Sequence, residues 1–151
     1  MTLTINGIEG VKEQAGNHLG YSGWHEVTQE QVNTFADATG DHQWIHVDVE
    51  RAKQGPFGGP IAHGYLTLSL GPLLIPQIVR VEGVALTVNY GLNRVRFPAP
   101  LPVGVRWRGG GAPSEVCEIA GGLQVKLRLT VEVERSEKPA VVADSLIRVY
   151  A

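Results

Sequence analysis

A run of strict alternation near the carboxyl end constrains the fold of this chain most. From Leu123 to Glu134, apolar and polar side chains alternate over twelve residues. Successive side chains of a strand point to opposite faces of its sheet, so this pattern predicts a strand with one buried and one wet face. Burial on one side only is typical of an antiparallel sheet.

Shorter runs with the same two-residue period surround this strand. We expect further strands at Ala85–Tyr90, Arg94–Phe97, Gly104–Arg108 and Val141–Tyr150. The Gly109–Gly111 triplet predicts a turn or a bulge, because consecutive glycines usually interrupt regular structure. The second half of the chain therefore predicts a long antiparallel sheet.

The first half carries helical periodicity instead, and its best-defined helix is expected at about 29–39. Thr28 and Gln31 form a capping-box pattern at its start, and Gly40 is a typical residue for its end. Less regular patterns predict a short helix within 7–15, an extended segment at 19–27, one or two helical turns within 48–54 and a loop at 55–60.

A strongly apolar segment beginning at Ile61 predicts the centre of the core. We expect a helix from about Gly64, with a kink or an end near Gly71, because Pro72 and Pro76 each remove a backbone donor. A sheet and one apolar helix bury each other as two layers, so the predicted class is α+β, with the antiparallel sheet wrapped around a central apolar helix.

Length and composition exclude several other kinds of protein. A chain of 151 residues fits a single domain, expected over residues 1–151. Lys and Arg number 13 against 15 Asp and Glu, so no basic field favours nucleic-acid binding. Cys117 is the only cysteine, which rules out an internal disulfide and argues against a cysteine-based zinc site. It lies among residues expected to form a turn.

Neither a secretion signal nor a membrane span is visible in the sequence. The N-terminus lacks a basic region and an apolar leader, and the apolar segment 61–79 is interrupted by glycine, proline and polar residues. We therefore expect a soluble, cytoplasmic protein with no membrane partner.

Chemically useful residues gather just after the expected helix end at Gly40. Asp41 and His46 follow in a polar loop and can share one water if the loop folds back on itself. A carboxylate can orient a water or an imidazole, and an imidazole transfers protons near neutral pH. The alternative is structural: Asp41 caps the next turn, and His46 packs against Trp44.

A second candidate lies at the start of the apolar helix. Gly64 has no side chain, so a ligand carbonyl can approach its amide at a helix N-terminus, where partial positive charge favours an oxyanion. The alternative is a plain tight turn in which His63 holds the loop.

Together, these two segments resemble one family, the MaoC-like (R)-specific enoyl-CoA hydratases, and within it the single-domain, nodulation-protein-N-like subgroup. The resemblance covers about 19–150 and rests on Gly40-Asp41-x-x-x-x-His46, Pro60-Ile-Ala-His63-Gly64, Asp41–Asp48 and Asn89–Pro100.

This resemblance implies a hot-dog fold, usually dimeric, with the pocket between the sheet and the central helix. It implies that Asp41 and His46 hold and activate a water for addition to a trans-2-enoyl-CoA thioester, while the amide of Gly64 polarises the thioester carbonyl. The resemblance implies no metal and no redox cofactor. Coenzyme A is part of the substrate and is not counted as a cofactor. Substrate contacts are expected from Gln43, His63 and Tyr65. Most members have Asn-Pro where this chain has Gln43-Trp44, and Gln43 retains an amide that donates and accepts hydrogen bonds.

Other functions stay open beside hydration and its reverse, dehydration. A hot-dog acyl-CoA thioesterase also needs an activated water near a thioester, although the Asp41–His46 motif favours the hydratase. A non-catalytic acyl-thioester-binding module has no use for an acid–base pair. The acyl chain length, and the choice between coenzyme A and acyl carrier protein, are not determined by the sequence.

Alternating arginines raise one further alternative. Arginines recur at every second position of two expected strands, as is typical of solvated faces; one or two could instead meet the phosphates of coenzyme A. They are Arg94, Arg96, Arg106 and Arg108.

Overall fold

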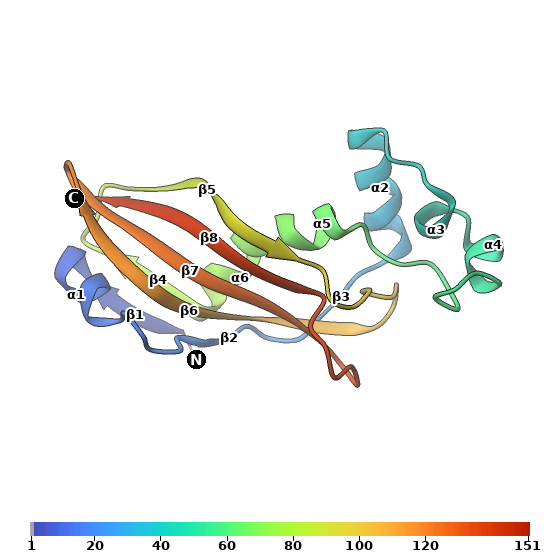
Figure 1. The fold of residues 1–151 in the computed structure, drawn as a ribbon, viewed down its shortest axis with the longest axis horizontal. Helices are drawn as coiled ribbons and strands as arrows, with labels where there is room; N and C mark the ends of the chain where they lie inside the picture. The colour runs from blue at the N-terminus through green and yellow to red at the C-terminus, as the bar shows by residue number, and fades with distance from the viewer. Residues whose placement is uncertain (1) are drawn as a thin grey trace.

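The main sheet of the protein is antiparallel and strongly curved. The computed structural model describes residues 2–151. Its long strands lie in the order β6-β7-β8-β5, and two short strands, β2 and β3, pair with the free edge of β6 (Figure 1). The strands are β2 (Gly20–Tyr21), β3 (His25–Glu26), β5 (Leu86–Arg96), β6 (Arg106–Ile119), β7 (Gly122–Val133) and β8 (Val141–Tyr150).

The alternating segment forms β7, in the interior of this sheet. Its apolar residues are buried and its polar residues are partly or fully exposed along the whole strand, as predicted. The strand expected at the end of the chain is β8, which pairs with both β7 and β5. The predicted antiparallel sheet with one buried face is therefore confirmed.

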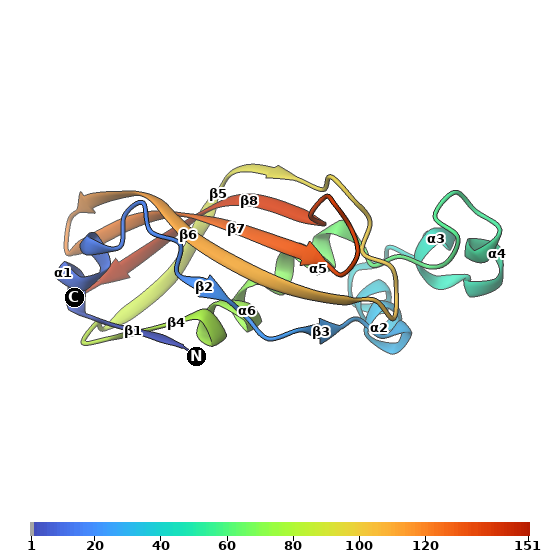
Figure 2. The same ribbon diagram turned by 90° about the horizontal axis from the view of Figure 1, so that it is seen from below.

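Two consecutive helices, α5 (Gly64–Ser69) and α6 (Gly71–Ile78), lie against the buried face, and the sheet curves around them (Figures 1 and 2). Leu66, Leu70 and Leu74 bring their side chains into one core with Trp107 and Val131. The interruption predicted near Gly71 falls at Leu70, and Pro72 occupies the first turn of α6, where no donor is needed.

The turn or bulge expected at Gly109–Gly111 is wrong, because β6 continues through all three glycines. Gly109 pairs with Val131 of β7, and a side chain there has no room: an ideal Cβ would lie 2.5 Å from Cδ1 of Leu74. The glycines thus let α6 approach the strand closely. Cys117, expected among turn residues, also lies within β6 and is exposed.

Two of the predicted strands are one. β5 runs through both expected segments, with register shifts against β8 between Asn89 and Gly91 and between Leu92 and Arg94. These irregularities break the two-residue period, which explains why the sequence shows two short runs. β5 is an edge strand, and most of its residues are exposed.

Short-range sequence patterns correctly predicted helices in the first 55 residues of the chain. α2 (Gln29–Thr39) begins where the Thr28 hydroxyl accepts from the Gln31 N–H, and it ends at Gly40 with a φ of 84°. The short helix and the helical turns are present as α1 (Gly7–Glu13) and α4 (Val49–Lys53), and β2 and β3 occupy the expected extended segment.

Three elements were not predicted. A short helix, α3 (Trp44–Val47), lies between α2 and α4, and these three helices project from one end of the sheet (Figure 1). At the other end, β1 (Leu3–Asn6) pairs in parallel with β4 (Val79–Glu82), directly after α6.

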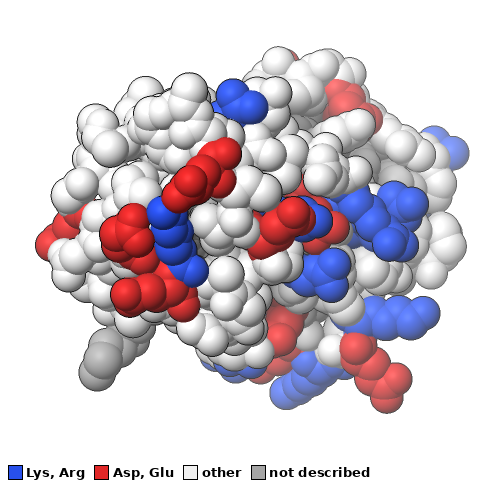
Figure 3. Space-filling view, turned by 60° about the vertical axis from the view of Figure 1, so that its left-hand side comes forward, with Lys and Arg blue, Asp and Glu red and all other residues white. Residues whose placement is uncertain are grey.

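The surface carries charges of both signs. Acidic and basic side chains lie close together on the face shown in Figure 3, and cross-strand ion pairs join Arg108 to Glu132 and Arg128 to Asp144. Across residues 2–151, no helix has the length and apolar character needed to cross a bilayer.

Candidate active site

His46 is held by its backbone surroundings in one orientation. It lies in α3 with 6% of its surface exposed, and its Nδ1 is 2.7 Å from the carbonyl oxygen of Ile61. A carbonyl only accepts hydrogen bonds, so Nδ1 carries the hydrogen and Nε2 of the neutral ring keeps its lone pair. Burial lowers the pKa of His46, although the bond to Ile61 opposes this shift. The ring is therefore neutral at physiological pH and presents an acceptor.

Asp41 lies on the loop directly after the left-handed end of α2, and it is exposed. Its Oδ1 accepts a hydrogen bond from the backbone N–H of Gln43 at 3.3 Å. This contact matches the turn capping that the structural alternative expected. Trp44 packs beneath the guanidinium of Arg51, and His46 stacks instead on His63, with ring centroids 3.9 Å apart.

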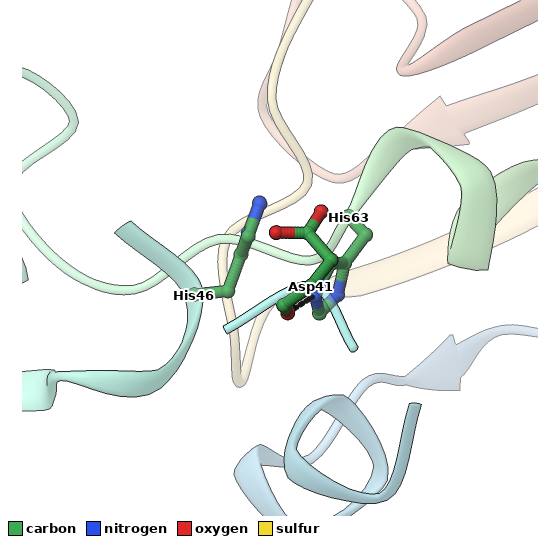
Figure 4. A group of neighbouring side chains, drawn as sticks. All are labelled: Asp41, His46 and His63. Carbon is green, nitrogen blue, oxygen red and sulfur yellow. Dashed lines mark hydrogen bonds between the residues drawn. The ribbon is translucent and has the colours of Figure 1, made fainter. Parts of the chain in front are cut away.

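Folding brings Asp41, His46 and His63 together (Figure 4). One carboxylate oxygen of Asp41 and one ring nitrogen of each histidine all lie within 4.8 Å of one another. One water can bridge groups at this spacing. The same three atoms are close enough together to hold a metal ion. That no metal takes part stays a prediction.

His63 is the most deeply buried of the three residues, with 2% of its surface exposed. Its Nε2 is 3.0 Å from the backbone carbonyl oxygen of Asp41, so this nitrogen donates to the loop that carries the carboxylate (Figure 4). Its Nδ1 is buried, and no described residue forms a hydrogen bond with it. His63 precedes α5, and its own carbonyl accepts from the Thr67 hydroxyl at 3.1 Å. The expected substrate contact of His63 stays a prediction, while its contacts to the loop are formed.

Gly64 is the first residue of α5, so its N–H has no partner within the helix. It lines a cavity of about 280 Å³ together with Thr67, Phe97 and Leu101. An ideal Cβ at Gly64 would lie 3.2 Å from the ring of Phe97, which leaves little room for a side chain. The geometry fits the sequence argument that an approaching carbonyl needs glycine here, and its role as an oxyanion donor stays a prediction.

A larger apolar cavity of about 630 Å³ runs along α5 and α6, against β5 and β8. Tyr65 lies in its wall and is 75% exposed, while Leu68, Leu129 and Ile147 line its apolar surface. Sequence reasoning named only Tyr65 of this group, because the cavity depends on how helix and sheet pack. Gln43 lines neither cavity and contacts Asp41 through its backbone, so its expected substrate contact also stays a prediction.

Comparison with known proteins identifies the family. The model of the MaoC like domain matches residues 11–135, so the chain belongs to the family of MaoC-like domains. It is 53% identical over 149 residues to 3-hydroxyacyl-thioester dehydratase Z of Mycobacterium tuberculosis, covering 98% of this chain and 99% of the relative. It is 44% identical over 138 residues to nodulation protein N of Rhizobium leguminosarum bv. viciae, covering 89% and 85%.

Solved structures agree on the fold. A protein from Archaeoglobus described as a monoamine oxidase regulatory protein superposes with a TM-score of 0.79 at 27% identity, over 99% of this chain and 97% of the other. The (R)-hydratase from A. caviae superposes with a TM-score of 0.70 at 21% identity, over 85% and 92%. The predicted α+β hot-dog fold and the predicted family are thus confirmed, and the names of the relatives support a hydro-lyase.

Proposed function

We propose that the protein is an (R)-specific 2-enoyl-CoA hydratase, or 3-hydroxyacyl-CoA dehydratase in the reverse direction. The observation that carries this proposal is the cluster of Asp41 and His46, whose carboxylate oxygen and ring nitrogen lie within 4.8 Å of each other. Membership of the MaoC-like family and the 53% identity to a 3-hydroxyacyl-thioester dehydratase support it. The (R) stereochemistry is proposed from the resemblance of the motif.

The proposed water lies between two acceptors. An ionised Asp41 only accepts hydrogen bonds, and His46 offers the lone pair of Nε2. A water between them donates one hydrogen to each, so its oxygen lone pairs point away from both groups and toward a bound thioester. Position and orientation are thereby set before reaction, which is a large part of the catalytic gain in such sites.

The proton that leaves the water and the proton that Cα receives are both carried by this pair of residues. In hydration, the water oxygen bonds to Cβ of the enoyl group and its proton passes to Nε2 of His46. His46 then returns a proton to Cα on the same face, which gives syn addition, and dehydration runs through the same steps in reverse. The lowered pKa of His46 suits this role, because the ring enters the cycle neutral.

Negative charge builds on the thioester oxygen during this step, and we assign its stabilisation to the N–H of Gly64. This donor lies next to His63, which binds the Asp41 loop, so the oxyanion site and the acid–base pair share one support. Removing one such donor typically costs about 10²–10³ in kcat. The apolar cavity that begins at Tyr65 is the proposed place of the acyl chain.

Crotonyl-CoA with the purified protein tests the proposal. A hydratase consumes enoyl absorbance without releasing thiol, whereas a thioesterase releases free coenzyme A, and a binding module does neither. Asp41→Asn and His46→Gln should each lower kcat by about 10²–10⁴. If both groups act on one water, the double variant should be little slower than the slower single variant. A fully active single variant rejects the assignment.

A further inference from the structure

The first half of β5 carries its polar side chains on the inner face of the sheet. Thr87 lies opposite Val149 of β8, and Asn89 lies opposite Ile147. Residues directly opposite each other in an antiparallel pair point to the same face, and Val149 is buried on the inner one. The residues of this half that point outward are apolar or aromatic and exposed: Leu86, Val88 and Tyr90. This arrangement is the reverse of the usual one, and such reversals are typical of functional sites.

These polar side chains line the large cavity along α5 and α6. Thr87 and Asn89 are joined there by Ser145 of β8. Within residues 2–151, no hydrogen bond involves any of these three side chains, whereas the hydroxyl of Ser69 in the same wall donates to the Leu66 carbonyl at 2.7 Å. A hydroxyl and a carboxamide each offer both a donor and an acceptor. One side of a mainly apolar cavity therefore presents hydrogen-bonding groups without partners.

The lining of the cavity indicates which kind of ligand group fits there. No lysine, arginine, histidine, aspartate or glutamate is among the residues that line it in the described part of the chain. A charged group would lose its hydration without gaining an opposite charge, which is costly. A pure hydrocarbon chain would cover the three polar side chains and leave them unpaired, which also costs free energy. An uncharged oxygen group, a hydroxyl or a carbonyl, pairs with them.

We propose that this side of the cavity recognises an uncharged oxygen group on the acyl chain, so the preferred substrate is an oxygenated 2-enoyl thioester. This inference rests on the proposed function and names its substrate class. The thioester carbonyl is assigned to Gly64, and the chain enters the cavity at the next residue, Tyr65. Thr87, Asn89 and Ser145 belong to the strands that form the opposite wall. The recognised oxygen therefore lies beyond the double bond, toward the end of the chain.

Two substrates with equal numbers of chain atoms test this inference. One is (E)-dec-2-enoyl-CoA, which ends in a methyl group, and the other is (E)-9-hydroxynon-2-enoyl-CoA, which ends in a hydroxyl group. A shorter and a longer pair move the terminal group along the cavity. The measured quantity is the ratio of kcat/KM for the hydroxylated substrate to kcat/KM for the alkyl substrate. In the wild type, this ratio should be highest at the chain length that brings the hydroxyl to the polar wall.

Two variants remove hydrogen-bonding groups from the wall. Asn89→Leu and Ser145→Ala should each lower the ratio about fivefold at that chain length, which is the usual effect of one neutral hydrogen bond. Asn93→Leu is the matched control, because it makes the same change on the same strand at an exposed residue that lines neither cavity, and it should keep the wild-type ratio. Titration calorimetry with the corresponding saturated acyl-CoA pair repeats the comparison without turnover, and the same fivefold changes in affinity are expected.

The outcomes separate this inference from the proposed function. If the wild type hydrates both substrates but Asn89→Leu and Ser145→Ala do not lower the ratio at any chain length, this inference is wrong and the proposed function stands. Asn89→Leu could instead shift sedimentation toward the monomer with an unchanged ratio. The polar wall would then serve the contact between two copies, and the inference would be equally wrong. A wild type that hydrates neither these substrates nor crotonyl-CoA removes the proposed function and this inference with it.

Discussion

His63 makes contacts that a loop anchor alone does not need, and replacing it gives the sharpest test of how the site is held. His63→Ala removes the hydrogen bond to the Asp41 carbonyl, worth about 1 kcal/mol, and the stacking on His46, worth about 1 kcal/mol. The void beneath His46 adds about 1–2 kcal/mol. Removing the unpartnered Nδ1 returns up to about 1 kcal/mol. We expect the free energy of unfolding to fall by about 2–4 kcal/mol.

Loss of stability and loss of positioning are separated by a second variant. His63→Phe keeps a ring against His46 and has no buried nitrogen, so its stability should lie close to that of the wild type. It cannot donate to the Asp41 carbonyl, so the carboxylate should be less well placed, and kcat should fall about 10²-fold. His63→Gln retains a donor of similar reach and should recover part of this loss.

Urea unfolding and the rate of crotonyl-CoA hydration measure the two quantities on the same preparations. A His63→Phe protein with wild-type kcat would show that the bond to the Asp41 carbonyl does not position the carboxylate. A His63→Ala protein of wild-type stability would refute the sum of contacts given above.

Three more predictions concern pH, the amide of Gly64 and assembly. Burial lowers the pKa of His46, while the unfolded ring takes up its proton near pH 6.5, so the free energy of unfolding should fall as pH decreases from about 6.5 toward the lowered pKa. The value of kcat/KM should fall once the ring of the folded protein is protonated. His46→Gln should flatten the dependence of stability on pH, and a variant with the wild-type dependence contradicts the argument. Gly64→Val directs a branched side chain toward the ring of Phe97 and should lower kcat about 10²-fold without disturbing Asp41 or His46 in NMR spectra; wild-type turnover would rule out an oxyanion site at Gly64. The exposed edge of β5, with Leu86 and Val88 at its surface, predicts a homodimer. Sedimentation should therefore give a mass of about twice 16.3 kDa, and Val88→Lys should shift the equilibrium toward the monomer. A wild-type protein that is active as a monomer is the contrary result.

The parts of the fold that sequence could predict are those decided locally. α2 is bounded by a hydroxyl cap and a left-handed glycine, and both are readable from neighbouring residues. β7 has a buried face, so its alternation is nearly complete. α3 was missed because four residues are too few to show a helical period, and the parallel pairing of β1 with β4 joins segments far apart in the chain.

The same distinction applies to the candidate site. The sequence predicts that Asp41 and His46 meet only if the loop after α2 folds back, and in the structure their carboxylate oxygen and ring nitrogen lie within 4.8 Å of each other. It could not show that His63 binds the backbone of Asp41, because a contact to a carbonyl leaves no pattern of side chains. Nor could the sequence show which of the alternating arginines form ion pairs, because Arg106 reaches Glu134 only through the register of β6.

Because α6 lies so close to Gly109, a side chain at this position and the side chain of Leu74 would compete for the same space. Alanine usually stabilises a strand more than glycine does, but at this position its methyl group would occupy the space of the Leu74 side chain. A larger residue at Gly109 is therefore tolerated only with a smaller one at Leu74, and the two positions should vary together among related chains. Because α6 follows α5 after a single residue, a misfit between them would also displace Gly64 at the far end of α5. The rate of the reaction would then change through a strand residue that touches neither substrate nor water.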